Sequence, residues 1–123
     1  MKFLQQNTLL SKNQYGFLPQ SSTEGAFLKL LSIISDSLNK GFIILLIFLD
    51  YSKAFDSIVH SILGEKLRKG FHFSENATSF ILSYLKNRSQ YVSWKDAISE
   101  VLYIKYGVPQ GSILGPLLFL LYI

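Results

Sequence analysis

The chain has 123 residues, with 12 Lys and Arg against 8 Asp and Glu, and carries a formal net charge of +4 at pH 7. Hydrophobic residues make up 49% of the chain and charged residues 16%, which excludes intrinsic disorder and allows one domain with a moderate core. The absence of cysteine excludes disulfides, a disulfide-linked partner, thiolate metal sites and a cysteine nucleophile.

The first predicted element is a helix over residues 23–39. Ser21 and Glu24 have the spacing of a capping box at its start. Gly41 is expected to end it, as a glycine just past a helix often does. Five residues at helical spacing form one apolar stripe along it: Phe27, Leu30, Leu31, Ile34 and Leu38.

Residues 42–49, FIILLIFL, predict a strand. The run is short, continuous and contains β-branched residues, a pattern typical of a strand buried on both faces in the centre of a sheet. This run and residues 113–123 both fall short of the roughly 20 apolar residues that span a bilayer, so we expect no membrane protein. The chain start has no continuous apolar stretch, so we expect a cytoplasmic or nuclear protein rather than a secreted one.

Two more helices follow in the predicted order. The first begins after Asp56, which we expect to act as its cap, and ends at Gly70. Its predicted inward residues are Val59, Ile62, Leu63 and Leu67. The second begins at the candidate cap Ser74. Its predicted apolar stripe is Ala77, Phe80, Ile81, Tyr84 and Leu85.

Residues 90–94 and 101–106 predict an antiparallel pair of strands, with a polar turn at Lys95 and Asp96. A last helix is expected to begin near Gly115. The order helix, strand, two helices, two strands and helix predicts an α+β domain. The final helix has no visible end, which leads us to expect that the domain is cut off before it is complete.

Asp50 directly follows the apolar run. A carboxylate at the exit of a central strand is a rigid mount for a magnesium ligand, because Mg²⁺ prefers carboxylate oxygens together with substrate phosphates. The alternative is an aspartate that caps a turn at the end of a strand, and this feature alone favours that alternative. Phe55 lies five residues after Asp50, where the chain turns away from the predicted strand. Its spacing alone does not distinguish it from an ordinary core aromatic.

Residues 107–116, GVPQGSILGP, contain three glycines and two prolines and predict a tightly shaped loop. Glycines let a backbone approach a ligand closely, and a nearby helix start favours anionic groups. Gln110 could then reach a nucleotide. The alternative is a loop that only turns the chain from the hairpin into the last helix.

Together these stretches resemble a known family. The resemblance rests on Ser22-Thr23-Glu24, FLDYSKAFDSIVH (48–60), LKNRSQYV (85–92) and GVPQGSILGPLLFLLYI (107–123), in that order and spacing. They are similar to reverse transcriptases of non-LTR (LINE-like) retrotransposons, and to the Jockey-like group in particular. The likeness runs from about Gln14 to Ile123, nearly the whole chain.

The resemblance implies the metal chemistry of an RNA-directed DNA polymerase. Asp50 would be the first catalytic, metal-binding aspartate of the palm, with Tyr51 beside it in the metal site. In the complete enzyme, two Mg²⁺ ions would stabilise the attacking and leaving oxygens as a primer 3′-hydroxyl joins the α-phosphate of a deoxynucleotide. RNA template, DNA primer and deoxynucleotide triphosphates are the partners that the resemblance implies.

The resemblance also implies the nucleotide contacts. The backbone of Ser52, Lys53 and Ala54 would lie near the triphosphate. Phe55 would be the steric gate that packs against the sugar and disfavours a 2′-hydroxyl. Gln110 would contact the incoming nucleotide, with Gly111 allowing close approach.

The fold implied is a partial fingers–palm structure, with fingers in residues 1–40 and an antiparallel palm sheet backed by helices in residues 41–123. The family's aromatic-x-Asp-Asp hairpin, which carries further metal ligands, is not found in the 123 residues. We therefore expect this chain alone to be inactive and not to bind both magnesium ions. The alternative function is a non-catalytic nucleic-acid or protein binding module derived from such a domain.

Overall fold

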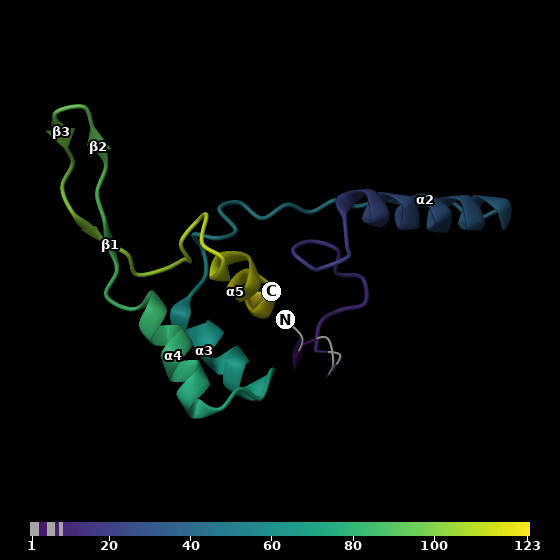
Figure 1. Ribbon diagram of the computed structural model, residues 1–123. Coiled ribbons are helices and arrows are strands. Elements are labelled where there is room, and N and C mark those ends of the chain that lie inside the picture. The colour runs from purple at the N-terminus through teal and green to yellow at the C-terminus, as the bar shows by residue number, and fades with distance from the viewer. Residues whose placement is uncertain (1–2, 5–6, 8) are drawn as a thin grey trace. The chain divides into compact units, whose positions relative to one another are not determined.

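The computed structural model describes residues 3–4, 7 and 9–123 and divides into two units, residues 1–51 and 52–123. The elements, in chain order, are α2 (Thr23–Asn39), α3 (His60–Lys69), α4 (Glu75–Leu85), β1 (Ser89–Gln90), β2 (Ser93–Trp94), β3 (Ala97–Ile98), β4 (Leu102–Tyr103) and α5 (Leu114–Tyr122) (Figure 1). Helices with small antiparallel sheets make this an α+β chain, as predicted. None of the described helices is both long and apolar enough to cross a membrane.

In the first unit, α2 has the predicted bounds. Its cap is one residue later than predicted, because the Ser22 hydroxyl, not that of Ser21, accepts the N–H of Gly25 at 3.0 Å. Gly41 follows the helix at φ +77°, a left-handed conformation that suits glycine and ends the helix as expected.

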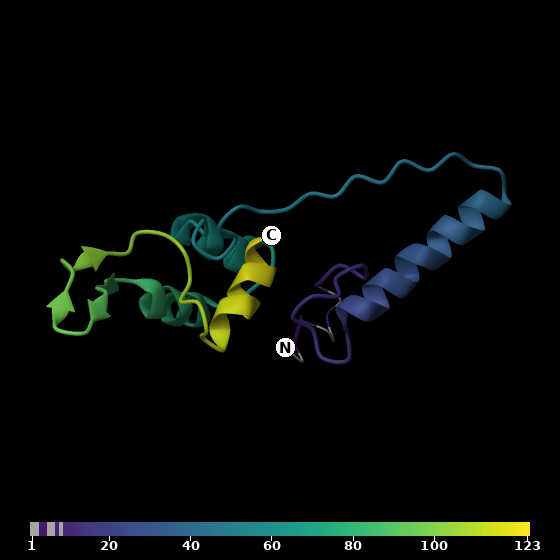
Figure 2. The same cartoon turned by 90° about the horizontal axis from the view of Figure 1, so that it is seen from above.

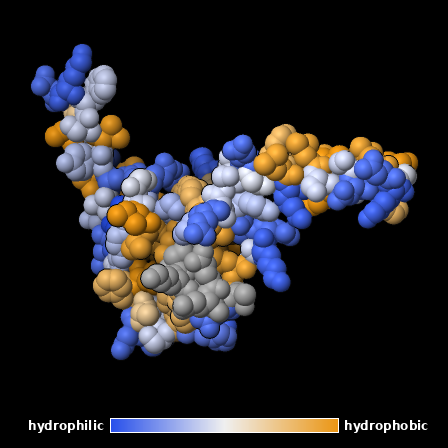
Figure 3. All heavy atoms as spheres, turned by 45° about the vertical axis from the view of Figure 1, so that its right-hand side comes forward, coloured by the Kyte–Doolittle hydropathy of each residue, from blue (hydrophilic) through white to orange (hydrophobic). Residues whose placement is uncertain are grey.

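The apolar stripe of α2 lies on the surface. No residue of this helix is buried, and Phe27, Leu31 and Leu38 are exposed. Figure 3 shows apolar side chains at the surface along this helix. The periodicity therefore predicted the helix correctly, and its apolar stripe is not buried.

Residues 42–49 do not form the predicted central strand. They are an extended connection without regular structure between α2 and α3, and Ile43 and Leu49 are 100% and 90% exposed (Figure 1). A strand exists only where a neighbour supplies hydrogen-bond partners to its backbone. The described strands form two two-stranded sheets, β1 with β4 and β2 with β3, and neither sheet includes this run.

The core of the second unit forms where α3 packs against α4 and α5 (Figure 2). Its buried apolar residues are Ile58, Leu63, Leu67, Leu85, Val108, Leu118, Leu120 and Leu121. Among the positions of α3 predicted to face inward, Leu63 and Leu67 are confirmed, but Ile62 is 44% exposed. In the predicted stripe of α4, Leu85 is buried and Phe80 is 72% exposed.

Gly64 explains part of this difference. It is buried in α3, and a Cβ at this position would lie 2.9 Å from Leu82 Cδ1 of α4. The missing side chain lets the two helices approach closely through the face that carries Gly64 and Leu67, which turns Ile62 outward. A glycine that weakens the isolated helix thus permits tighter packing between helices.

The hairpin that follows α4 carries four short strands. Ser89 pairs with Tyr103 at its base and Trp94 with Ala97 at its tip, both antiparallel. The predicted turn at Lys95 and Asp96 is confirmed, but the return strand begins at Ala97 rather than at residue 101. Both faces of every strand are exposed.

An ion pair joins α3 to α4. Arg68 donates two hydrogen bonds to the Glu75 carboxylate, at 2.7 and 2.8 Å. These hydrogen bonds from Arg68 lower the pKa of Glu75 below its ordinary value of 4.5. Ser74 caps α4 beside this pair, as predicted, by accepting the N–H of Ala77.

We predict that Leu63→Ala lowers the free energy of unfolding by about 2–5 kcal/mol, because it removes a fully buried side chain and leaves a cavity. Ile62→Ala is the matched control, on the same helix but 44% exposed, and is expected to cost clearly less. Urea unfolding followed by circular dichroism measures both. Equal losses in the two variants would contradict the described orientation of α3.

The Arg68–Glu75 pair predicts a small acid-dependent loss of stability. Because the pKa of Glu75 is lowered in the folded chain, the pair's contribution is present above the ordinary carboxyl pKa and is lost as the pH falls through the lowered value. Glu75→Gln is expected to weaken this part of the pH dependence, and both groups are exposed, so the effect is small. Thermal midpoints between pH 6 and pH 3, roughly the range in which carboxyls titrate, would reveal it; identical pH profiles for variant and parent exclude it.

Candidate functional site

The loop between β4 and α5, here named the glycine loop (residues 107–111), docks on the segment that precedes α3. Gly107 donates its N–H to the carbonyl of Ile58 at 2.7 Å, and Val108 donates to the carbonyl of Phe55 at 2.9 Å. These bonds join two segments that lie far apart in the sequence. The docked pair is the framework on which the other site residues are held.

A side chain reinforces this docking. Nε2 of His60, the first residue of α3, lies 2.7 Å from the Gly107 carbonyl oxygen. A carbonyl oxygen only accepts hydrogen bonds, so Nε2 of His60 is the donor and carries a proton. The start of α3 is thereby tied to the start of the glycine loop.

Gly107 is required by space as well as by conformation. Its φ is +83°, and a Cβ there would lie 2.8 Å from Asp56 Cα and 2.9 Å from the Phe55 carbonyl oxygen. Gly111 has a similar φ of +77°, but a Cβ there would meet nothing within 4 Å. Only the first of the two glycines is therefore demanded by close packing of backbone on backbone.

The chain then turns tightly into α5. The Ser112 hydroxyl donates to the Pro109 carbonyl at 2.7 Å and accepts the N–H of Gly115 at 3.0 Å. A Cβ on Gly115 would lie 2.9 Å from the same carbonyl. The helix begins at Leu114, as predicted, and the loop is held at both ends.

One cavity, of about 470 Å³, brings predicted site residues together. It is lined by Phe55, Pro109, Gln110, Gly111, Ser112 and Pro116, and is named here the gate cavity. Three of the predicted nucleotide contacts, Phe55, Gln110 and Gly111, thus lie around one space. Phe55 is half-buried, and its ring lies 5.1 Å from that of Phe119 in α5, at an interplanar angle of 39°.

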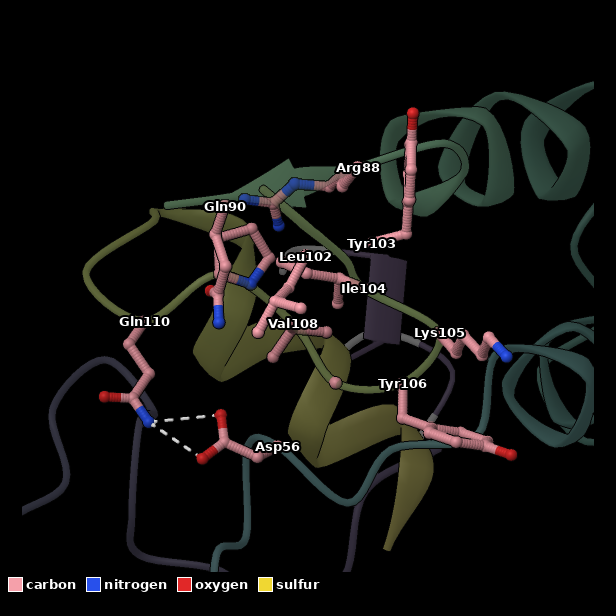
Figure 4. Close-up of a pocket in the computed structure, with 12 residues that line it drawn as sticks. Asp56, Arg88, Gln90, Leu102, Tyr103, Ile104, Lys105, Tyr106, Val108 and Gln110 are labelled. Carbon is pink, nitrogen blue, oxygen red and sulfur yellow. Dashed lines mark hydrogen bonds between the residues drawn. The ribbon is translucent and has the colours of Figure 1, made fainter. Parts of the chain in front are cut away.

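A larger cavity, of about 700 Å³, lies along the base of the hairpin and is named here the hairpin cavity (Figure 4). Its lining includes Asp56, Arg88, Gln90 and Gln110, so Gln110 borders both cavities. Arg88 is half-buried and belongs to the LKNRSQYV stretch, yet sequence reasoning assigned it no role. The signal that could have indicated a role for Arg88 is its positive charge just before a segment predicted to form a strand.

Asp56 is not the helix cap that the sequence predicted. The N-cap of α3 is Val59, which makes no side-chain capping bond. A turn in which the Asp56 and Ser57 N–H groups donate to the Lys53 carbonyl keeps Asp56 away from the helix start. The two carboxylate oxygens of Asp56 instead accept hydrogen bonds from Nε2 of Gln110, at 3.3 and 3.4 Å (Figure 4).

The remaining predicted site residues, from Asp50 to Ala54, line neither cavity. Asp50 and Tyr51 are exposed at the end of the extended segment of the first unit. The run from Ser52 to Ala54 opens the second unit as a turn, with Lys53 at φ +53°, and lines neither of the two cavities.

A metal centre is not assembled by the residues that the structure describes. They contain no cluster of three or more His, Asp or Glu side chains that could hold an ion. One or two carboxylates can hold a single Mg²⁺ together with waters and substrate phosphates, but one carboxylate cannot position and neutralise two ions. The described residues therefore do not fit a complete two-ion site.

Comparison with known proteins agrees with the family resemblance that the sequence motifs indicated. The family described as "Reverse transcriptase (RNA-dependent DNA polymerase)" matches residues 1–123. The probable RNA-directed DNA polymerase from transposon BS of Drosophila melanogaster is 32% identical over 111 residues, which are 90% of this chain and 12% of that protein. The RNA-directed DNA polymerase from mobile element jockey of Drosophila funebris is 32% identical over 110 residues, 89% of this chain and 12% of that protein.

A third relative is more similar over a shorter stretch. The probable RNA-directed DNA polymerase from transposon X-element of Drosophila melanogaster is 40% identical over 76 residues, 62% of this chain and 8% of that protein. The chain thus spans about an eighth or less of the length of these relatives. No solved structure matches it significantly.

We predict that Gly107→Ala destabilises the second unit more than Gly111→Ala does. Both variants force alanine into a left-handed conformation, at about 1–2 kcal/mol, but only Gly107→Ala adds a collision with backbone atoms. Overpacking of this kind raises its total to about 2–5 kcal/mol. Urea titrations of the two variants measure the difference, and equal destabilisation would show that the loop does not dock as described.

Proposed function

The chain belongs to the reverse transcriptase (RNA-dependent DNA polymerase) family, and on that premise we propose that it supplies the nucleotide-contacting part of a retrotransposon polymerase site. The relatives confirm the resemblance to reverse transcriptases of the Jockey-like non-LTR elements. One observation carries the proposal: Phe55, Gln110 and Gly111, which come from two distant motifs, line the same gate cavity.

The reaction proposed for the complete enzyme adds a deoxynucleotide to a primer 3′-hydroxyl on an RNA template. Most of the catalysis in such transfers is positioning and charge stabilisation. The ring of Phe119 packs against the ring of Phe55, so the Phe55 ring can oppose a 2′-hydroxyl without rotating away from it. Gln110 offers its amide to the nucleotide, and Gly111 leaves space beside it, since nothing lies within 4 Å of its missing Cβ.

The triphosphate and metal contacts are proposed from the motif. We assign the backbone of Ser52, Lys53 and Ala54, an exposed turn, to the triphosphate. Members of this family generally use divalent metal ions, and we assign Asp50 and Tyr51 to the Mg²⁺ site. Since the described residues do not complete that site, we propose that these 123 residues alone do not polymerise.

The rest of the assignment follows from the family. We propose that residues 1–40 are a fingers segment and residues 41–123 part of the palm. RNA template, DNA primer and deoxynucleotide triphosphates are the proposed partners, and the cytoplasm or nucleus is the proposed location.

A second candidate function is nucleic-acid binding without catalysis. Arg88 and Lys105 border the hairpin cavity, and the chain carries a net charge of +4. Binding through phosphate contacts weakens steeply with salt and would not depend on Asp50. RNA binding that falls with salt but survives Asp50→Ala, with no activity in any longer context, would favour this second function.

We predict that the chain restores primer extension when it replaces the matched 111 residues of the transposon BS polymerase. In this chimera Asp50→Asn should abolish extension, whereas Asp36→Asn, an exposed acid in α2, should not. Phe55→Val should raise ribonucleotide incorporation relative to deoxynucleotide incorporation, because the smaller side chain opens the space for a 2′-hydroxyl. The isolated 123-residue chain is expected to show no templated synthesis.

Two outcomes would contradict the proposal. Extension that persists in Asp50→Asn would remove Asp50 from the catalytic site. A chimera that folds and binds primer–template but never extends would contradict a polymerase role for these residues.

A further inference from the structure

Asp56 and Gln110 face each other across the docked segments. Both carboxylate oxygens of Asp56 lie within hydrogen-bonding distance of a single atom, Nε2 of Gln110, at 3.3 and 3.4 Å. Their main chains have little freedom to separate, because Gly107 packs directly on Asp56 Cα and the loop is tied to Ile58. The contact is thus a consequence of the docking and joins two exposed side chains whose backbones are fixed.

The hydrogen-bonding roles of the two side chains determine the orientation of the Gln110 amide. A glutamine amide has a donor end and an acceptor end of nearly equal size, and shape alone does not distinguish them. An ionised carboxylate only accepts hydrogen bonds, so the NH₂ end must face Asp56. The amide oxygen of Gln110 is therefore turned away from Asp56, as Figure 4 shows.

Gln110 borders both cavities, whereas Asp56 borders only the hairpin cavity. We propose that Asp56 is a positioning residue: it holds the amide of Gln110 so that Oε1 is offered as an acceptor to a hydroxyl group of the bound nucleotide's sugar. This inference rests on the proposed function and specifies it further. It gives a role to Asp56, an acidic residue that is not assigned to the metal site.

A positioning role for Asp56 differs from the helix-capping role that the sequence predicted. A cap would act on α3 alone, and its loss would leave Gln110 unaffected. A positioning residue acts on Gln110 and changes how the chain distinguishes ligands with and without a hydroxyl donor. Asp56→Asn is the informative variant, because it keeps the shape but can face the amide of Gln110 with either end.

The test uses the full 123-residue chain, labelled with ¹⁵N at glutamine. The side-chain NH₂ resonances of Gln110, assigned with a Gln110→Leu variant, are expected to shift in Asp56→Asn and to stay near their original positions in Asp56→Glu. Asp96→Asn, in the exposed turn of the hairpin, is the matched control and should not move them. Retention of the circular dichroism spectrum shows that each variant is folded.

The second readout uses the transposon BS chimera and compares binding of thymidine triphosphate with binding of its 3′-deoxy analogue. In the parent chimera, loss of the hydroxyl donor is expected to weaken binding about three- to tenfold, and in Asp56→Asn this difference should shrink toward none. Unchanged Gln110 resonances in Asp56→Asn would overturn the inference. Resonances that respond to Asp56, in a chain whose chimera binds neither nucleotide, would instead overturn the proposed function, and with it the ligand assigned to Gln110.

Discussion

The docking of the glycine loop on the segment before α3 is the constraint on which the rest of the site depends. Two backbone hydrogen bonds and the His60 contact hold it, and the packing of Gly107 on Asp56 leaves no space for a side chain. Through this one junction Phe55 and Gln110 come to line the same cavity. A site made from two distant motifs is then as rigid as the backbone that joins them.

The helices stabilise the junction from both sides. His60 begins α3, the glycine loop leads through Ser112 into α5, and these two helices pack on each other in the core. Phe119 of α5 packs against the ring of Phe55. A substitution in the core can therefore alter the gate cavity without replacing a residue that lines it. The reason is that the helices that bury Leu63 and Leu118 also position the two docked segments.

Local signals predicted what depends on local interactions. Ser74, Gly41 and Gly70 mark helix ends through caps and backbone conformation, and those ends were found where expected. The strand predicted at residues 42–49 failed because a strand requires partners that the run itself does not specify. The role of Asp56 was missed for a related reason: its partner lies 54 residues away, and capping was the only role visible nearby. Motif resemblance, not periodicity, selected Phe55, Gln110 and Gly111.

The most direct test is to map where a photoreactive deoxynucleoside triphosphate attaches to the chain. The cross-linked peptides, identified by mass spectrometry, should contain Phe55 and the stretch from Pro109 to Ser112, and unlabelled deoxynucleotide should suppress the labelling. Gly107→Ala should abolish both cross-links together, since both depend on the docked loop. Labelling confined to other peptides, or labelling that excess nucleotide does not suppress, would contradict the account.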